Sequence, residues 1–329
     1  MSERVTAEQA AALLRGADHI LILTHQFPDG DTLGSGFALC RALTKLGKAV
    51  RVECADPIPD KYDYMLEGLD APSMETAAPA AVFEPRFICA VDVADTCLLG
   101  ALSSYAQRID LCIDHHGSNV EYARRLLLDA GCAATAQLIA EIIRLLGVPF
   151  DRAIAECIYT GLATDTGCFK YANTTAATHR LAADMMELGT RTEMINRVMF
   201  DIKSRARVEL ERQALDSMCF YFHGRCAVMT ITNDMIEQSG AKENDMEGLP
   251  PIPRQIEGVW VGVTLRQKTD GNYKVSLRTG NHADASAVCA LLGGGGHIRA
   301  AGCTLEAPAD AAISRILDAV RQSVPDIDS

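Results

Sequence analysis

Carboxylate and imidazole side chains follow four separate segments of the 329-residue sequence, each where a predicted strand or helix ends. Predicted strands end before Thr24-His25, before Asp92 and before Asp114-His115-His116, and a predicted helix ends before Thr164-Asp165. The first of these segments continues as Gln26-Phe27-Pro28-Asp29-Gly30-Asp31. Because the carboxyl ends of parallel strands meet at one edge of a sheet, we expect these side chains to converge there.

A convergence of this kind is suited to metal ions. Three to five carboxylates in one place repel each other strongly unless cations offset their charge. Imidazole and carboxylate together suit Mn²⁺, Fe or Zn²⁺ better than they suit a bare Mg²⁺ site. The pattern therefore predicts a metal centre at the ligand-binding edge of a sheet.

Each segment also has an ordinary structural interpretation. Pro28-Asp29-Gly30 is a common turn, Asp31 suits the N-cap of a helix, and Asp92 suits a strand end. The Asp114-His115-His116 run is harder to explain in this way, because these three side chains cannot all enter a core without polar partners. Since all four segments would have to be structural at once, the sequence favours the functional interpretation.

The elements that must position these residues alternate between strands and helices through the first half of the chain. Short apolar runs predict buried strands, and apolar residues at helical spacing predict helices. This alternation indicates an α/β fold with a doubly wound, mostly parallel sheet. The predicted strands are Ile20–Leu23, Ala49–Cys54, Phe87–Val91 and Leu111–Ile113, and the predicted helices are Ser35–Leu46, Ala134–Leu146, Arg152–Ala163, Thr175–Leu188 and Glu193–Asp201.

The second half of the chain predicts a smaller α+β domain, with a hairpin at Asp270-Gly271. Its predicted strands are Cys226–Thr232, Val259–Gln267 and Tyr273–Thr279, and its predicted helices are Ala285–Leu292 and Pro308–Ser323. We divide the chain into a metal-site domain (1–190), a helical linker (191–222) and a substrate-binding domain (223–329), with the active site expected in the cleft between the domains. The polar, Pro-rich stretch 237–253 is expected to be an excursion or a loop over that cleft.

Composition limits the possible functions. A hydrophobic fraction of 48% and a charged fraction of 22% are ordinary for globular proteins, and the length suggests two domains. A net charge of −12 gives no global field that attracts long nucleic acid. The N-terminus has no export signal, and no apolar run approaches the ~18 residues of a membrane span. The 12 cysteines include no Cys-x-x-Cys pair, so we expect buried free thiols in a cytoplasmic protein without membrane contact.

The ordered set of motifs resembles the DHH phosphoesterase superfamily followed by its DHH-associated C-terminal domain, over nearly the whole chain. Length and spacing are most similar to the nano-RNase type, which combines oligoribonuclease activity with phosphatase activity on 3′-phosphoadenosine 5′-phosphate (pAp). The matching motifs are Thr24-His25-x-x-Pro28-Asp29-Gly30-Asp31-x-x-Gly34-Ser35, Val91-Asp92, Ile113-Asp114-His115-His116-x-x-Asn119, Tyr159-Thr160-Gly161-Leu162-x-Thr164-Asp165-Thr166-Gly167, Ser276-Leu277-Arg278 and Gly293-Gly294-Gly295-Gly296-His297-x-x-Ala300-Ala301-Gly302.

This resemblance implies a site with two Mn²⁺ ions, with Mg²⁺ or Fe²⁺ as possible replacements. Two such ions about 3.5–4 Å apart can bridge a water, deprotonate it near neutral pH and direct it at phosphorus. Every implied position carries the expected residue type. The implied roles are His25 and Asp29 on one ion, Asp31, His115 and Asp165 on the other, Asp92 as the bridge, His116 facing the substrate phosphate, and Asp114 orienting the two histidines.

The resemblance also implies a substrate grip in the second domain. Four carboxylates, two divalent ions and a bridging hydroxide leave a site near −1, so a phosphate needs further donors. We expect N–H groups at a helix start near Gly34-Ser35 to contribute. The expected substrate-binding residues are His116, Arg266, Arg278, Gly294, Gly295, Gly296 and His297.

We therefore expect an enzyme that hydrolyses very short RNA, such as pApA or pGpG, to mononucleotides and dephosphorylates pAp, and that acts as a homodimer without binding long duplexes. The sequence does not choose among these small nucleotides. Alternatives are a soluble cyclic-dinucleotide phosphodiesterase or a single-strand-specific exonuclease. A manganese pyrophosphatase fits less well, because pyrophosphatases of this superfamily lack the Gly-rich signature. A metal-dependent binding protein without turnover is disfavoured by the intact motifs.

Overall fold

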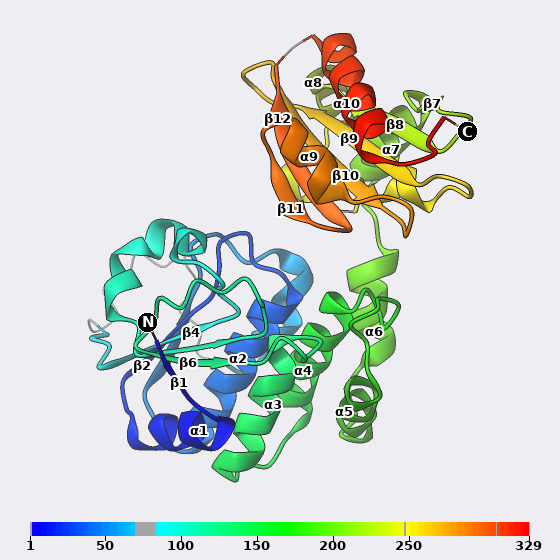
Figure 1. Cartoon of the computed structure of the whole chain (residues 1–329). Coiled ribbons are helices and arrows are strands. Elements are labelled where there is room, and N and C mark those ends of the chain that lie inside the picture. Colours follow the sequence, from blue (N-terminus) through cyan, green and yellow to red (C-terminus); the bar gives the residue numbers. More distant parts are fainter. Residues whose placement is uncertain (1, 70–82, 247, 307, 329) are drawn as a thin grey trace. The chain divides into compact units, whose positions relative to one another are not determined.

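The computed structural model describes residues 2–69, 83–246, 248–306 and 308–328, which form two compact units (Figure 1). The units are Met1–Ile202 and Lys203–Ser329, so their boundary lies within the range predicted as a linker. In the described part of the chain, no helix has the length and apolar character needed to cross a membrane.

The first unit is built on a six-stranded sheet in which every strand pair is parallel. This confirms the predicted α/β class. The chain passes from β2 outward to β3 and then returns to β4 on the other side of β2, so the topological switch point lies between the carboxyl ends of β2 and β4. The strand order is β1 (Glu3–Arg4), β6 (Arg125–Leu128), β5 (Leu111–Asp114), β4 (Phe87–Val91), β2 (Ile20–Leu23) and β3 (Val50–Glu53).

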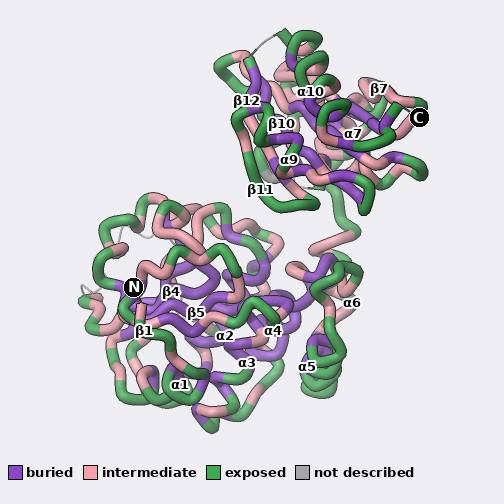
Figure 2. The backbone as a smooth tube through the Cα atoms, viewed as in Figure 1, coloured by how far each residue is buried: buried purple, intermediate pink, exposed green. Residues whose placement is uncertain are grey.

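Both faces of this sheet are covered, and the buried backbone of its strands runs through the middle of the unit (Figure 2). Successive side chains of a strand point to opposite faces, so Ile20 and Ile22 join a core with the helices, while Leu21 and Leu23 pack with the 3₁₀ segment η2 (Thr96–Arg108). The helices of the first core are α1 (Ala7–Gly16), α2 (Gly30–Lys45), α3 (Thr135–Leu146), α4 (Arg152–Asp165), α5 (Ala176–Glu187) and α6 (Thr192–Asn196). A 3₁₀ turn, η1 (Asp60–Met65), and a π-helical turn, η3 (Arg197–Asp201), complete the unit.

Helices α2 and α4 approach each other closely because glycines line their contact. A Cβ on Gly34 would overlap the carbonyl oxygen of Cys157, and a Cβ on Gly161 would lie only 2.7 Å from Oδ1 of Asp31. Only residues without a side chain fit these two positions. The contact brings the start of α2, which carries Asp31, alongside the end of α4, which carries Asp165.

The predicted start of the helix Ser35–Leu46, which corresponds to α2, was wrong. Helix α2 begins at Gly30 rather than Ser35, because the Asp29 carboxylate caps it by accepting the N–H groups of Asp31 and Thr32. The N–H groups of Gly34 and Ser35 therefore lie inside the helix, and the expectation that they open toward the metal centre was also wrong.

The second unit is a mixed sheet in which only β8 and β9 pair in parallel, and its β9–β10 hairpin confirms the prediction at Asp270-Gly271. Its strand order is β11 (Gly295–His297), β12 (Ala300–Leu305), β10 (Tyr273–Thr279), β9 (Val261–Gln267), β8 (Cys226–Ile231) and β7 (Cys219–Tyr221). Helices α9 (Ala285–Leu291) and α10 (Ala309–Ser323) share its larger core. A smaller core contains residues of α7 (Arg205–Asp216), α8 (Asn233–Ser239), η4 (Glu243–Met246) and η5 (Ile252–Gln255).

The stretch 237–253, predicted as an excursion or loop, contains the end of α8, the turn η4 and the start of η5, while its residue 247 lies outside the described residues. All 12 cysteines are free thiols. Seven are buried as expected, whereas Cys97 and Cys219 are exposed and Cys132, Cys168 and Cys303 are partly exposed.

A methyl group at Gly34 is expected to destabilise the first unit, because overpacking a close contact costs about 1–3 kcal/mol. Gly16→Ala is the matched control: Gly16 also lies in a helix, but its Cβ would meet no described atom within 4 Å. We expect the control to be neutral or to add up to about 1 kcal/mol of stability. Urea unfolding followed by circular dichroism measures both, and equal stability of the two variants would contradict the close-packing interpretation.

Candidate metal centre

The structure brings the predicted carboxylates and imidazoles together in three overlapping groups, each with ligand atoms within 4.8 Å of one another. One group combines residues that follow β2 and β4, the second combines residues of α2 and α4 with the loop after β5, and the third combines the residue after β4 with that same loop. The groups are His25, Asp29 and Asp92; Asp31, His115 and Asp165; and Asp92, His115 and His116.

Asp92 lies between the first two groups. One of its carboxylate oxygens lies 3.6 Å from Nε2 of His25, and the other lies 3.8 Å from Nε2 of His115. Its side chain is 2% exposed. The backbone of Asp92 has φ +60°, a left-handed conformation that costs energy for a residue with a side chain and that occurs disproportionately at functional sites. The geometry suits a carboxylate shared by two cations.

Asp31 is held by the first turn of α3. The backbone N–H groups of Thr135 and Ala136 donate to its two carboxylate oxygens at 2.6 and 2.9 Å. The Thr135 hydroxyl donates to Asp92 at 2.8 Å, so a single residue orients two acids. The sequence analysis missed Thr135. One signal for a role of Thr135 was available in the sequence. Thr135 is a polar residue at the start of a helix, and the residue before it, Ala134, has no side chain that could cap that helix.

The two inner histidines point their Nε2 atoms at carboxylates. Nδ1 of His25 lies 2.8 Å from the carbonyl of Gln26, and Nδ1 of His115 lies 3.2 Å from the carbonyl of Cys132. A carbonyl can only accept, so these contacts place the ring proton on Nδ1 and leave Nε2 as the ligand atom. Nε2 of His115 then faces Asp165 at 3.4 Å.

The third histidine is fixed differently. Buried Asp114 accepts from Nδ1 of His116 at 2.8 Å and from the Asn119 amide at 2.7 Å. The hydrogen bond that His116 donates to Asp114 raises the pKa of His116 to about 9 despite partial burial. Burial opposes the ionised form of Asp114, but its hydrogen bonds from His116 and Asn119 outweigh this and lower its pKa. The side chain of His116 is 43% exposed, so its Nε2 is available to a ligand.

The donor set fits divalent cations. Nε2 of His115 is buried and makes no hydrogen bond within the described residues, although carboxylate oxygens surround it. Burial and the neighbouring negative charges raise the pKa of Asp31 well above its usual range and that of Asp165 to about 6. The lone pair of Nε2 therefore faces the lone pairs of carboxylate oxygens. This arrangement is stable only with positive charge between the nitrogen and the oxygens. Imidazole with carboxylate is a ligand set for Mn²⁺, Fe²⁺ or Zn²⁺.

The second unit has a cavity of about 930 Å³ on the face of its sheet. Four of the predicted substrate-binding residues, Arg266, Arg278, Gly295 and Gly296, line it, and both η-nitrogens of Arg266 donate to Glu243. The sequence analysis missed Glu243.

The other two predicted residues lie in the adjoining strands and loop. Gly294 packs against Gly302 and Cys303, and His297 pairs with Ala300 between β11 and β12. Nη1 of Arg278 donates to the carbonyl of Leu277 at 2.9 Å.

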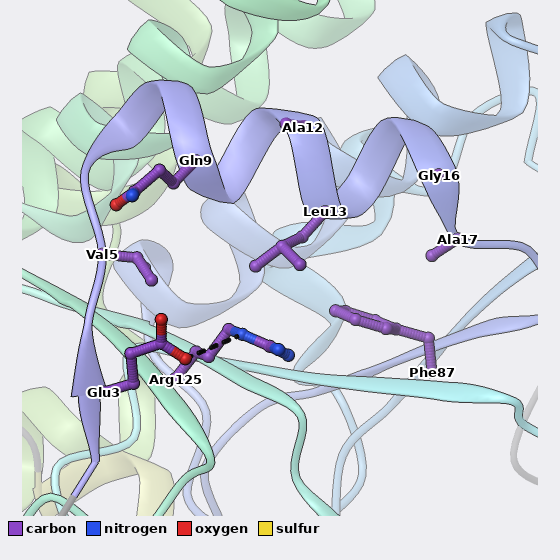
Figure 3. Close-up of a pocket in the computed structure, with 9 residues that line it drawn as sticks. All are labelled: Glu3, Val5, Gln9, Ala12, Leu13, Gly16, Ala17, Phe87 and Arg125. Carbon is purple, nitrogen blue, oxygen red and sulfur yellow. Dashed lines mark ion pairs between the residues drawn. The ribbon is translucent and has the colours of Figure 1, made fainter.

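A different hollow, of about 580 Å³, lies below α1 in the first unit (Figure 3). Phe87 and Arg125, the first residues of β4 and β6, line it, so it lies at the amino ends of the strands, opposite the metal-ligand groups. Its charged lining residues, Glu3 and Arg125, pair with each other at 3.3 Å. The described residues that line this hollow offer no set of groups suited to catalysis.

Two family models match the chain: the DHH family, N-terminal domain, over residues 19–162, and the DHHA1 domain over residues 224–325. The bifunctional oligoribonuclease and PAP phosphatase NrnA of Thermus thermophilus is 35% identical over 313 residues, which cover 93% of this chain and 90% of the relative. The chain belongs to the DHH family. This confirms the resemblance on which the expected site was based.

Other DHH-family relatives agree with this assignment. The bifunctional oligoribonuclease and PAP phosphatase NrnA of Bacillus subtilis is 23% identical over 301 residues, covering 88% of this chain and 90% of the relative. The crystal structure of an exopolyphosphatase-related protein from Bacteroides fragilis superposes with a TM-score of 0.87 at 25% identity and covers 98% of both chains. All residues of the three metal-ligand groups except Asp165 lie inside the matched DHH region. The residues that line the cavity of about 930 Å³ lie inside the DHHA1 region.

Removing the Thr135 hydroxyl is expected to weaken metal binding. Thr135→Val keeps the side-chain shape and the N–H that holds Asp31 but loses the hydrogen bond to Asp92. Loss of such an outer contact typically lowers metal affinity about 10–100-fold. Titration calorimetry of the metal-stripped protein with Mn²⁺ measures this, and Thr135→Ser should restore wild-type affinity. A valine variant that binds Mn²⁺ like the wild type would rule out this positioning role.

Proposed function

We propose that this protein is a metal-dependent phosphoesterase that hydrolyses very short oligoribonucleotides, such as pApA and pGpG, to mononucleotides and removes a phosphate from pAp. The observation that carries the proposal is the pair of ligand groups on either side of buried Asp92. The names of the DHH relatives from Thermus and Bacillus, which include oligoribonuclease and PAP phosphatase, support oligoribonucleotides and pAp as substrate classes.

The proposed cofactors are two Mn²⁺ ions, with Mg²⁺ or Fe²⁺ as alternatives. Two such ions supply an activated water and offset the charge of a phosphate when they are bound. The proposed ligands are His25 and Asp29 on one side, Asp31, His115 and Asp165 on the other, and Asp92 on both.

In this proposal His116 and Asp114 do not bind the metal ions. His116 contacts the substrate, and Asp114 orients His116. Asp114 fixes the His116 ring through Nδ1, which leaves the exposed Nε2 to donate a proton to a phosphate oxygen. Asn119 in turn holds Asp114. A fixed donor loses little entropy when it binds an anion, so it contributes more than a mobile side chain would.

The second unit would hold the far end of the substrate, with Arg278, the glycine run and His297 as donors. A cavity of about 930 Å³ has the volume of sites for small ligands, which supports a substrate of a few nucleotides rather than a long strand. Arg266 would join these donors of the second unit when a phosphate replaces Glu243. A cytoplasmic homodimer completes the proposal, and light scattering in solution tests the dimer.

The decisive experiment gives the metal-stripped protein pApA, pAp, a cyclic dinucleotide, pyrophosphate and an RNA of about 24 nucleotides, each with and without Mn²⁺. Fast Mn²⁺-dependent loss of pApA and pAp with slow loss of the longer RNA is the expected result. Turnover confined to the cyclic dinucleotide, to the longer RNA or to pyrophosphate would replace the proposal with the corresponding alternative. Binding without any turnover would make the protein a binding module.

Replacing His116 by Gln is expected to lower kcat on pApA about 10²–10⁴-fold, the usual contribution of a positioned proton donor. Mn²⁺ binding should be retained, because His25 and His115 point their own Nε2 atoms at the carboxylates. Asp114→Asn should lower kcat in the same direction by releasing the His116 ring. His19→Gln is the control, since His19 lies before the amino end of β2. Full activity of the His116 variant would remove this residue from the mechanism.

A further inference from the structure

One arginine of the second unit lies over the same face of the sheet as the cavity of about 930 Å³. This residue, Arg254, belongs to the turn η5, which packs on β9. A Cβ on Gly262 of β9 would lie 2.5 Å from the backbone nitrogen of Arg254 and 2.8 Å from its Cβ. Gly262 pairs with Arg278 of β10, and residues directly opposite each other on two strands face the same side of a sheet. Since Arg278 lines the cavity, Arg254 lies on the cavity side of the sheet.

The side chain of Arg254 runs from Gly262 toward the end of β10. A Cβ on Gly280, the residue after β10, would overlap Nη2 of Arg254 and lie 3.1 Å from its Nε. Gly280 continues the strand pairing, because its N–H donates to the carbonyl of Trp260 at 3.0 Å. It lies two residues beyond Arg278, so both face the same side. Two positions without side chains therefore leave room for this guanidinium on the face that carries Arg278.

The guanidinium of Arg254 has no partner among the residues that the structure describes. No hydrogen bond or ion pair joins its side chain to them, although its Nε is buried. Other arginines of the unit are engaged: Arg266 donates to Glu243, and Arg299 donates to two loop carbonyls. An arginine keeps its charge at any physiological pH, and a charge removed from water is costly unless a partner compensates for it. The position of Arg254 therefore suits an anionic ligand.

We propose that Arg254 is a phosphate-binding residue and that it extends the anion-binding face of the second unit beyond Arg278. The planar fork of donors in arginine matches the oxygens of a phosphate, and a charged acceptor makes the stronger hydrogen bonds. A ligand with two phosphates can then place one at Arg278 and the other at Arg254. That this ligand is a nucleotide such as pAp or pApA rests on the proposed function, whereas the anion contact at Arg254 does not.

Calorimetry of the full-length protein in EDTA tests the contact directly, because no hydrolysis occurs without metal. The probes are pAp and the two adenosine monophosphates that each lack one of its phosphates. We expect Arg254→Met to weaken binding of pAp about 10–100-fold, as for loss of a charge-assisted hydrogen bond, while one of the monophosphates binds as before. Equal loss on all three ligands, or a wild type that binds pAp no better than the monophosphates, would overturn the proposal.

A second variant moves the guanidinium without removing its charge. The methyl group of Gly280→Ala occupies the place of Nη2 of Arg254, and the backbone of Gly280 is not left-handed, so alanine fits it. This variant should weaken pAp binding in the same direction as Arg254→Met. Arg212→Met is the control, since it removes an exposed arginine of the same unit that pairs with Glu209 and Asp216, and it should bind pAp like the wild type. A Gly280→Ala protein with wild-type affinity would contradict the placement of the site.

Stability and kinetics separate binding from a structural role. Removing a charge without a described partner should leave the urea midpoint of Arg254→Met unchanged or raise it, whereas a structural role would lower it. The KM for pApA should rise about tenfold or more with kcat changed much less. A lower midpoint, or a loss confined to kcat, would refute the assignment. If the wild type hydrolyses nothing, the proposed function fails, and the calorimetric series still decides the role of Arg254.

Discussion

Repulsion among buried carboxylates is the constraint around which the first unit is organised. Asp31 and Asp92 are almost fully buried, and both face Asp165 across His115. Ionised groups in such a place are costly unless donors or cations compensate for the lost water. The protein supplies part of that compensation at the switch point of a parallel sheet, where the first turn of α3 gives Asp31 two backbone N–H groups and Thr135 gives Asp92 a hydroxyl. The charge that remains accounts for the fit to divalent ions.

The hydrogen-bond partner of Nδ1 separates the roles of the three histidines. His25 and His115 each give the Nδ1 proton to a backbone carbonyl, which turns the lone pair of Nε2 toward the acids. His116 instead gives Nδ1 to the carboxylate of Asp114 and leaves Nε2 exposed. One sequence run, Asp114-His115-His116, thus contributes an orienting acid, an inward-facing base and an outward-facing donor. The alternation of side chains after a strand end makes this division possible, because neighbouring residues point in opposite directions.

The features that could be predicted from the sequence depend on local pattern. Apolar runs identify β2, β4 and β5, and a polar residue directly after such a run falls at the ligand-binding edge of a parallel sheet. Features that arise from tertiary contact could not be predicted in this way. Asp29 resembles part of a turn in Pro28-Asp29-Gly30, yet it caps α2, because the strand before it delivers the chain directly to the helix. Thr135 reaches Asp92 from a position 43 residues away, and β12 is too rich in small residues for a clear strand signal.

Local charge resolves the apparent conflict between an acidic protein and an anionic substrate. The chain carries a net charge of −12, but charges that lie more than about 8–10 Å from a phosphate are largely screened at physiological salt. Four basic side chains and one acidic side chain, Glu243, line the cavity of the second unit, which leaves a local excess of three positive charges. Glu243 is bound to Arg266, so a phosphate that binds Arg266 as proposed would have to compete with a carboxylate for the same guanidinium. Such a competition penalises weakly charged ligands and favours phosphate groups, because a dianion gains more than a carboxylate from a bidentate contact with arginine. Selectivity for phosphorylated ends would then follow from an internal competitor rather than from attraction by the protein as a whole.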